Sequence, residues 1–445
     1  MTIYTLSQGE ITSPVYARLA SGASAKAFAA GDTLAAGDVL VIDAATSSPD
    51  DVKLGFPALD AGASVLLLDA GDDYKEALAA KIGFRSHGAS RGYNAVRRTD
   101  DAGTVRFYVS EVGDTTAPAS LYSASGTADT ENGTNQVETQ GAVFENQEQT
   151  QTMTEEDLAF FLASLKPSVN LQAAATPPPA GLVKYTWIYS KSHSFTATGS
   201  ESDSGIGPPP SKTLSTNLTY TFEGALNNGV QSGAFQYLGV QENGIYQNNG
   251  MSSTSDTSFG WVLGSICPSF TASSSFYWYS SSPANTNDVT QVTTGSSVTV
   301  GFNASNTGGG GNASYTYSNS TTNNITDWYV TQQTTGSWIY AQNTPYDGNT
   351  TSGSTVSDCI NWYSGHVNTS SFPTISTSSL QFAANEVWKT NSVITSSQTF
   401  SISNQMRADY IMINTFLGLG TKWATWIYTS TPSDTFTIDM SVLNT

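Results

Sequence analysis

The chain has 445 residues, of which 12% are charged, and its formal net charge is −19. This length favours two or three domains and allows a large core without metal or disulfide staples. The acidic balance argues against a nucleic-acid partner, because phosphate binding needs clustered Lys and Arg. The densest basic spot here is only the pair Arg97-Arg98.

Few residues suit catalysis or metal binding. The two cysteines, Cys267 and Cys359, form no metal or redox motif, which leaves open one disulfide or two buried thiols. The three histidines are too scattered to predict a catalytic triad or a metal site. We expect no enzyme activity, no cofactor and no metal. The acids that a glycosidase could use as a carboxylate pair show no linking spacing: Glu223, Glu242, Asp327 and Asp358.

The chain has the composition of an exported protein. Its start, Met1 to Tyr4, has neither the basic start nor the apolar core of a signal peptide. No stretch approaches the ~18 apolar residues of a transmembrane helix. The body is nonetheless very rich in Ser, Thr, Asn and Tyr, so we expect a secreted protein.

Residues 1–113 predict a small α/β domain. Asp38 to Ile42 and Ala63 to Leu68 are short apolar runs suited to buried strands, with helical patterns between and after them. Tyr93 to Arg97 and Thr104 to Val109 predict a strand pair joined by a turn.

Residues 114–181 predict a linker with one short helix. Residues 114–153 hold few large apolar side chains and cannot bury enough surface to offset the entropy of ordering. Thr154 followed by Asp157 three positions later resembles a capping box at a helix start. The run Thr176 to Pro179 predicts a second boundary.

Residues 182–445 predict an all-β domain, so the fold class is mainly β with a small N-terminal α/β domain. Alternating apolar residues occur at Tyr185, Trp187 and Tyr189, and the same pattern returns near the chain end. Clusters of Gly, Asn, Ser and Asp separate these runs, as expected of antiparallel strands.

Ser296 to Asn324 reads as a hairpin without a charged side chain, turned at Gly308 to Gly311. Each arm has about the 9 to 11 residues that a tilted membrane-crossing strand needs. Asn319 and Thr321 continue the apolar face of the return strand with polar groups, which favours the alternative of an ordinary surface hairpin. The apolar face is predicted to hold Val298, Val300, Phe302, Ala304, Ala313, Tyr315 and Tyr317.

The other face of the hairpin is polar. A Lys or Arg facing lipid at mid-bilayer costs roughly 2 to 4 kcal/mol, so the lack of charge suits insertion. Backbone groups in lipid must all be paired, so several copies must close one barrel together. The residues predicted to line its water-filled lumen are Thr299, Asn303, Ser305, Asn312, Ser314 and Thr316.

Three segments, Ser297 to Phe302, Asn312 to Ser318 and Ile325 to Val330, resemble the stem of the leukocidin/hemolysin family of pore-forming toxins. Val65 to Asp69 and Arg106 to Val109 are similar in order to the small α/β pro-domain of the cytolysin precursors in that family. Further segments resemble the strands of its cap: Asn217 to Tyr220, Ser378 to Phe382, Val387 to Lys389, Gln398 to Ile402 and Phe436 to Asp439.

The resemblance implies a β-sandwich cap, a rim and a stem at about residues 292–326. It implies a soluble monomer that binds a lipid membrane and assembles into a homo-oligomer, a ring of seven. Each protomer then inserts one hairpin into an oligomeric transmembrane β-barrel. A protease removes the pro-domain by cutting within residues 114–181. The lectin domains of the cytolysins have no counterpart here.

The resemblance also places a membrane-facing rim at about residues 338–372. Aromatic rings suit the bilayer interface and attract choline headgroups by cation–π contact, and a glycan receptor is the other partner considered. Phe276 to Tyr279 reads instead as alternating core and edge of a strand. The aromatic candidates for headgroup binding are Trp338, Tyr340, Tyr346, Trp362 and Tyr363.

The Ser, Thr, Asn, Trp and Tyr content also fits a secreted glycan-binding or adhesin β-protein. The hairpin separates the two hypotheses, because only a pore-forming protein needs it to enter lipid.

Overall fold

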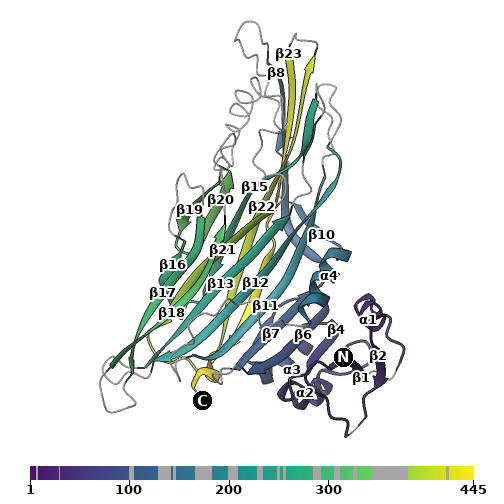
Figure 1. Cartoon of the computed structure of the whole chain (residues 1–445), viewed down its shortest axis with the longest axis vertical. Helices are drawn as coiled ribbons and strands as arrows, with labels where there is room; N and C mark the ends of the chain where they lie inside the picture. The colour runs from purple at the N-terminus through teal and green to yellow at the C-terminus, as the bar shows by residue number, and fades with distance from the viewer. Residues whose placement is uncertain are drawn as a thin grey trace.

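The computed structural model describes residues 1–6, 9–29, 31–99, 105–128, 142–143, 147–165, 183–198, 209–227, 234–247, 251–253, 257–283, 292–304, 311–323, 328–342, 379–416 and 420–444. Within these ranges the fold is mainly β with few helices, as the sequence predicts. The molecule is elongated, and its N-terminal third lies at one end, beside the long strands (Figure 1). None of the helices described has the length and hydropathy to cross a membrane.

The N-terminal third is an α/β unit. The apolar runs form β3 (Val39–Asp43) and β4 (Ser64–Ala70), which pair in parallel and are almost wholly buried. The predicted strand pair is confirmed as β6 (Ser90–Thr99) and β7 (Val105–Val112), which are antiparallel. The other elements are β1 (Thr2–Thr5), α1 (Pro14–Ala20), β2 (Ser24–Ala27), η1 (Pro49–Gly55), α2 (Phe56–Asp60), α3 (Asp72–Ile82) and β5 (Phe84–Ser86).

One large sheet, called here the first sheet, runs through the whole molecule. Its order is β16-β21-β13-β12-β11, and it continues through β7, β6, β4, β3, β1 and β2. The strands from the C-terminal part are β11 (Val183–Ala197), β12 (Lys212–Asn227), β13 (Phe235–Gln247), β16 (Phe276–Ser282) and β21 (Ser379–Thr390).

The second sheet has the order β10-β8-β23-β22-β15-β20-β19, with β24 on β22, β14 on β15 and β9 on β8. Strand β5 of the N-terminal unit pairs with β24. The bounds are β8 (Thr115–Ala128), β9 (Ala142–Val143), β10 (Gln147–Gln151), β14 (Met251–Ser253), β15 (Thr257–Thr271), β19 (Trp328–Thr334), β20 (Ser337–Gln342), β22 (Ser397–Phe416), β23 (Gly420–Ser430), β24 (Ser433–Asp439) and the closing η4 (Met440–Asn444).

The core lies between the two sheets and follows the alternation seen in the sequence. Trp187, Tyr189 and Tyr220 on the first sheet and Phe436 on the second are fully buried. The rings of Tyr189 and Phe436 meet edge to face, with centroids 5.0 Å apart. Aromatic pairs of this kind add about 0.5–1.5 kcal/mol beyond their buried area.

The stretch expected to be a linker contains ordered strands. β8 pairs with β23, and β10 pairs with β8. The composition argument missed them because a strand ladder uses backbone N–H and C=O groups, which Thr, Ala and Ser supply as well as large apolar residues do. The predicted helix is present as α4 (Glu155–Ser164), and the Thr154 hydroxyl accepts from the Asp157 amide at 3.2 Å. The Pro-rich run lies outside the described residues.

Candidate functional site

The predicted hairpin is a separate two-stranded sheet, β17 (Val292–Ala304) and β18 (Gly311–Asn323), that joins neither large sheet. Residues directly opposite one another in a ladder share a face. The register therefore brings the two apolar patterns onto one face of the ladder. The opposed residues are Val298 with Tyr317, Val300 with Tyr315, Phe302 with Ala313 and Ala304 with Gly311.

The same register collects the polar positions on the opposite face. Thr299 lies opposite Thr316, and Asn303 lies opposite Asn312. Ser314 lies opposite Gly301, while Ser305 is outside the described residues. The assignment of the two faces to lipid and to a pore lumen stays a prediction.

The hairpin lies against the first sheet. Cα atoms of β17 come within 8 Å of β12, β16 and β21, and Cα atoms of β18 come within 8 Å of β21. Figure 1 shows β17 and β18 alongside β16 and β21. The hairpin shares no ladder with these strands. In the residues that the structure describes, it is therefore not held there by the backbone hydrogen bonds of a sheet.

The first sheet carries a buried, mainly nonpolar strip beneath this layer, on the face away from the core; the polar residue Asn385 lies on the same face between Ala383 and Val387 and is 8% exposed. Leu238, Ala384 and Trp388 point into the core, so their strand neighbours point outward. The outward neighbours Tyr237, Ala383 and Val387 are nonetheless buried. Ala225, which lies opposite Tyr237 on β12, is buried as well. We call these residues the outer strip, with their exposed fractions: Ala225 (0%), Tyr237 (2%), Ala383 (1%) and Val387 (1%).

An aromatic edge borders the outer strip. On β16, Phe276 is buried, but Tyr277, Trp278 and Tyr279 are 39%, 48% and 38% exposed. The rings of Tyr237 and Tyr279 lie 5.3 Å apart, and burial raises the pKa of Tyr237 well above its usual range. The sequence expectation is therefore met in two respects: Phe276 lies in the core, and β16 is an edge strand of the first sheet. Four consecutive aromatics on one strand signal exposure, because alternation must turn some of them outward.

Two of the predicted headgroup-binding residues are core residues in this structure. Trp338 and Tyr340 are each 0% exposed. The Trp338 indole donates to the Pro283 carbonyl at 2.9 Å, and the Tyr340 hydroxyl donates to the Ala383 carbonyl. Both belong to the inward face of β20. In the sequence, alternating aromatics on such a buried face look the same as aromatics at a membrane interface. Tyr346, Trp362 and Tyr363 lie outside the described residues.

Replacing Trp338 by alanine should therefore destabilise the fold rather than act on lipid binding. Truncating a buried Trp costs about 3–5 kcal/mol through lost contacts and a residual cavity. Urea unfolding followed by fluorescence measures this loss. Trp278→Ala is the matched control, since a 48% exposed residue should change the unfolding free energy by no more than about 0.5 kcal/mol. Equal losses in the two variants would contradict the assignment of Trp338 to the core.

Two acids lie inside the sandwich on the strands that carry the outer strip. Glu242 on β13 is fully buried and Glu386 on β21 is 2% exposed. Burial raises the pKa of each carboxyl group to about 8. Both are therefore mainly neutral at pH 7, which limits the cost of keeping them in the core. The described part of the chain holds no cluster of three or more His, Cys, Asp or Glu side chains suited to a metal ion.

The chain matches no protein-family model and no curated protein sequence. Among solved structures, it is similar to Clostridium perfringens delta-toxin at 14% identity and a TM-score of 0.35, over 57% of this chain and 90% of that one. A structure titled a pore forming protein matches at 11% identity and a TM-score of 0.35, over 57% and 93%.

A third similar structure is the Clostridium perfringens NetB toxin in its membrane inserted form. It matches at 10% identity and a TM-score of 0.28, over 56% of this chain and 95% of that one. Because all three TM-scores are below 0.5, the functional proposal depends on the residues of this chain.

Proposed function

We propose that this chain is the precursor of a secreted β-barrel pore-forming toxin. One observation carries the proposal: an uncharged amphipathic hairpin, β17–β18, lies against a buried, mainly nonpolar strip on the outside of the first sheet but belongs to neither large sheet. In the residues described, it can therefore leave the strip without breaking a hydrogen bond of either sheet.

In the proposed mechanism the hairpin leaves the outer strip and enters the bilayer. Its backbone groups pair with hairpins from neighbouring copies, because unpaired N–H and C=O groups in lipid cost several kcal/mol each. The face with Val300 and Phe302 meets lipid, and the face with Thr299 and Asn303 lines the lumen. The resemblance to the leukocidin/hemolysin family adds a homo-oligomeric ring of seven.

The remaining parts of the proposal follow the same resemblance. Residues 1–113 are a pro-domain, residues 114–181 include the activation region, and residues 182–445 form the cytolysin domain. A protease cuts near residues 165–180. Trp362 and Tyr363 of the rim contact lipid headgroups, choline among them, or a glycan receptor.

Cutting the chain near residues 165–180 and adding liposomes should produce ring-shaped oligomers and release of an enclosed dye. The cut releases the proposed pro-domain, which restrains assembly, and the hairpins then insert into the bilayer. Negative-stain imaging and dye fluorescence measure the two results, with uncut chain as the control. Cut protein that stays monomeric on liposomes and releases nothing would refute the proposal.

A glycan-binding adhesin is the second candidate, because Tyr277, Trp278 and Tyr279 present exposed aromatic surface that could stack on sugars. Binding on a sugar array without dye release from liposomes would favour this function.

A further inference from the structure

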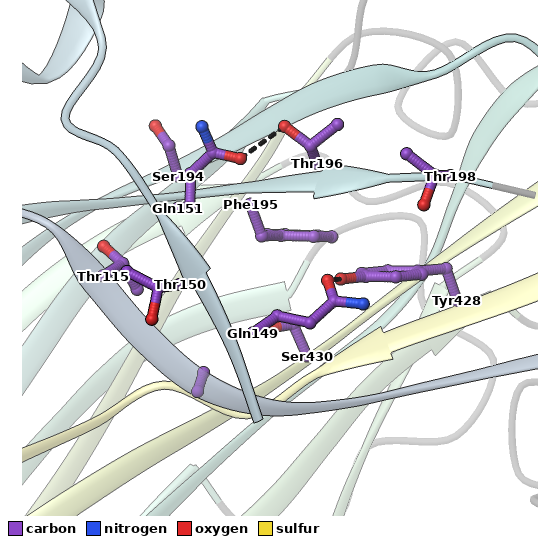
Figure 2. Close-up of a pocket in the computed structure, with 11 residues that line it drawn as sticks. Thr115, Gln149, Thr150, Gln151, Ser194, Phe195, Thr196, Thr198, Tyr428 and Ser430 are labelled. Carbon is purple, nitrogen blue, oxygen red and sulfur yellow. Dashed lines mark hydrogen bonds between the residues drawn. The ribbon is translucent and has the colours of Figure 1, made fainter. Parts of the chain in front are cut away.

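A polar pocket lies between the two sheets, where β8, β10 and β23 of the second sheet line it together with β11 of the first (Figure 2). Its volume is about 320 Å³, at the lower end of the about 300–1,000 Å³ of small-molecule sites. Gln149 and Thr198 are exposed, whereas Ser194, Phe195 and Ser430 are buried. The pocket therefore runs from the surface into the sandwich and can admit a small ligand.

The walls of the pocket are polar but uncharged. None of the described residues that line it has a charged side chain, and most of them carry a hydroxyl or an amide group. A bound anion or cation would find no opposite charge on these walls, so its desolvation would be costly. A wholly apolar ligand would leave the hydroxyl and amide groups without partners. The walls therefore favour a neutral ligand with several hydroxyl groups, which both donate and accept hydrogen bonds.

Two glutamines from β10 have fixed orientations at the pocket. Gln149 and Gln151 are two residues apart on one strand, so their side chains point to the same face. The Tyr428 hydroxyl donates to Gln149, and the Thr196 hydroxyl donates to Gln151 (Figure 2). The Gln151 amide also donates to the Thr152 carbonyl at 3.2 Å. Because these bonds join β10 to β11 and β23, the amide groups are positioned before a ligand arrives.

Two polar groups of the lining have no protein partner among the residues described. They are the amide nitrogen of Gln149 and the hydroxyl of Ser430. Ser430 is buried, and a buried polar group is normally hydrogen-bonded. The Ser194 hydroxyl, by contrast, donates to the buried Asp157 carboxylate at 2.8 Å. The pocket thus presents one amide donor and one hydroxyl to a ligand.

Phe195 and Tyr428 supply the apolar part of the wall. Both side chains are buried, and their rings stack with centroids 5.5 Å apart and planes 6° from parallel. A sugar ring carries apolar C–H groups beside its hydroxyl groups, so it can contact this wall and bond to Gln149 and Ser430 at once. A few polar groups that converge beside an apolar wall are typical of small-molecule sites.

We propose that this pocket binds a neutral saccharide of one or two rings. The Gln149 amide nitrogen and the Ser430 hydroxyl bond to the hydroxyl groups of the sugar, and Phe195 contacts its C–H groups. The inference goes beyond the proposed pore and does not depend on it, because none of the described lining residues belongs to β17 or β18. Sugar binding by a chain that releases no dye from liposomes would refute the pore and leave this inference intact.

Saturation-transfer NMR on the intact chain tests the proposal. The probes are the methyl glycosides of glucose, galactose, mannose and N-acetylglucosamine, with the negatively charged N-acetylneuraminic acid as the control ligand. At least one neutral glycoside should receive magnetisation from the protein, and N-acetylneuraminic acid should receive none. Transfer to none of the neutral glycosides, or to N-acetylneuraminic acid alone, would overturn the proposal.

Gln149→Glu tests the amide donor, because it keeps an oxygen that can accept from Tyr428 and replaces an exposed side chain. Titration of the bound glycoside should show about two- to tenfold weaker binding, as expected for the loss of one hydrogen bond. Gln147→Glu is the matched control, since Gln147 is exposed on the same strand and lies outside the described lining of the pocket. Equal affinities in these two variants would overturn the role of Gln149.

Ser430→Ala tests the inner end of the pocket and distinguishes it from the exposed aromatics of β16, the other place where a sugar could bind. This variant should also bind the glycoside about two- to tenfold more weakly. The Tyr277→Ala, Trp278→Ala chain should bind it as the wild type does. Full affinity in Ser430→Ala together with loss of binding in the Tyr277→Ala, Trp278→Ala chain would overturn the proposal and assign the sugar to β16.

Discussion

Replacing Val300 and Phe302 by lysine should abolish dye release by the cut chain while membrane binding and oligomer formation persist. Both residues lie on the face of the hairpin assigned to lipid, opposite Tyr315 and Ala313. Each lysine facing lipid costs roughly 2 to 4 kcal/mol, and every copy in a ring carries two. Liposome co-sedimentation, negative-stain imaging and dye fluorescence measure the three steps separately.

Thr299→Lys is the matched control, because it adds the same charge to the same strand on the opposite face. It should preserve dye release and shift ion selectivity toward anions, as a ring of lysines in a lumen does. Current recordings across a planar bilayer measure that shift. Loss of dye release in Thr299→Lys together with retention in the Val300→Lys, Phe302→Lys chain would reverse the assignment of the faces.

Replacing Glu111 by glutamine should lower the free energy of unfolding of the intact chain by about 3 kcal/mol at pH 7. Glu111 is 2% exposed, lies 3.2 Å from Lys75 and 3.6 Å from Lys191, and accepts from Tyr189 and Ser90. Burial disfavours its charge, but Lys191 and Lys75, together with hydrogen bonds from the Ser86 and Tyr189 hydroxyls, outweigh burial and lower the pKa of Glu111 to about 2. Removing the carboxylate leaves two buried cations with one fewer partner.

The lowered pKa of Glu111 determines how its contribution to stability changes with pH. The pKa of Glu111 is lower in the folded chain than its ordinary value of 4.5, so the unfolded chain binds more protons at intermediate pH. The stability from Glu111 is therefore complete above about pH 5 and disappears as the pH falls toward 2. Urea unfolding of the wild type and Glu111→Gln between pH 7 and pH 3 should show the difference shrinking as the solution becomes more acidic.

Glu148→Gln on β10 is the control for Glu111→Gln, because Glu148 is exposed and its loss should leave stability within about 0.5 kcal/mol. The cut Glu111→Gln chain should also release its N-terminal fragment faster than the cut wild type. A pH-independent difference between wild type and Glu111→Gln would contradict the ion pairs described for Glu111.

Much of the fold could be predicted from periodicity. The runs at β3 and β4 read as buried strands because both faces are apolar, and Tyr185, Trp187 and Tyr189 read as one face of a half-buried strand. The two faces of the hairpin could also be predicted from the sequence, because apolar residues such as Val300 and Tyr315 alternate with polar ones on both arms.

Other features depended on contacts between distant segments. β8 has no apolar pattern of its own, so its place on β23 could not be deduced from composition. Trp338 and Tyr340 were misread because an aromatic at a strand position does not reveal which face it occupies. The outer strip was missed because the burial of an outward residue such as Tyr237 depends on neighbours distant in sequence, among them Tyr279 on β16.

The most direct test of the central claim is the surroundings of the hairpin after the chain is cut and mixed with liposomes. An environment-sensitive fluorophore would be attached at Val300→Cys or, as the control, at Thr299→Cys, with Cys267 and Cys359 replaced by alanine. The proposed pore predicts that a lipid-attached quencher reduces the emission at position 300, whereas iodide in water reduces the emission at position 299. Equal quenching by iodide at both positions, unchanged by liposomes, would show that the hairpin never leaves the sheet for the membrane.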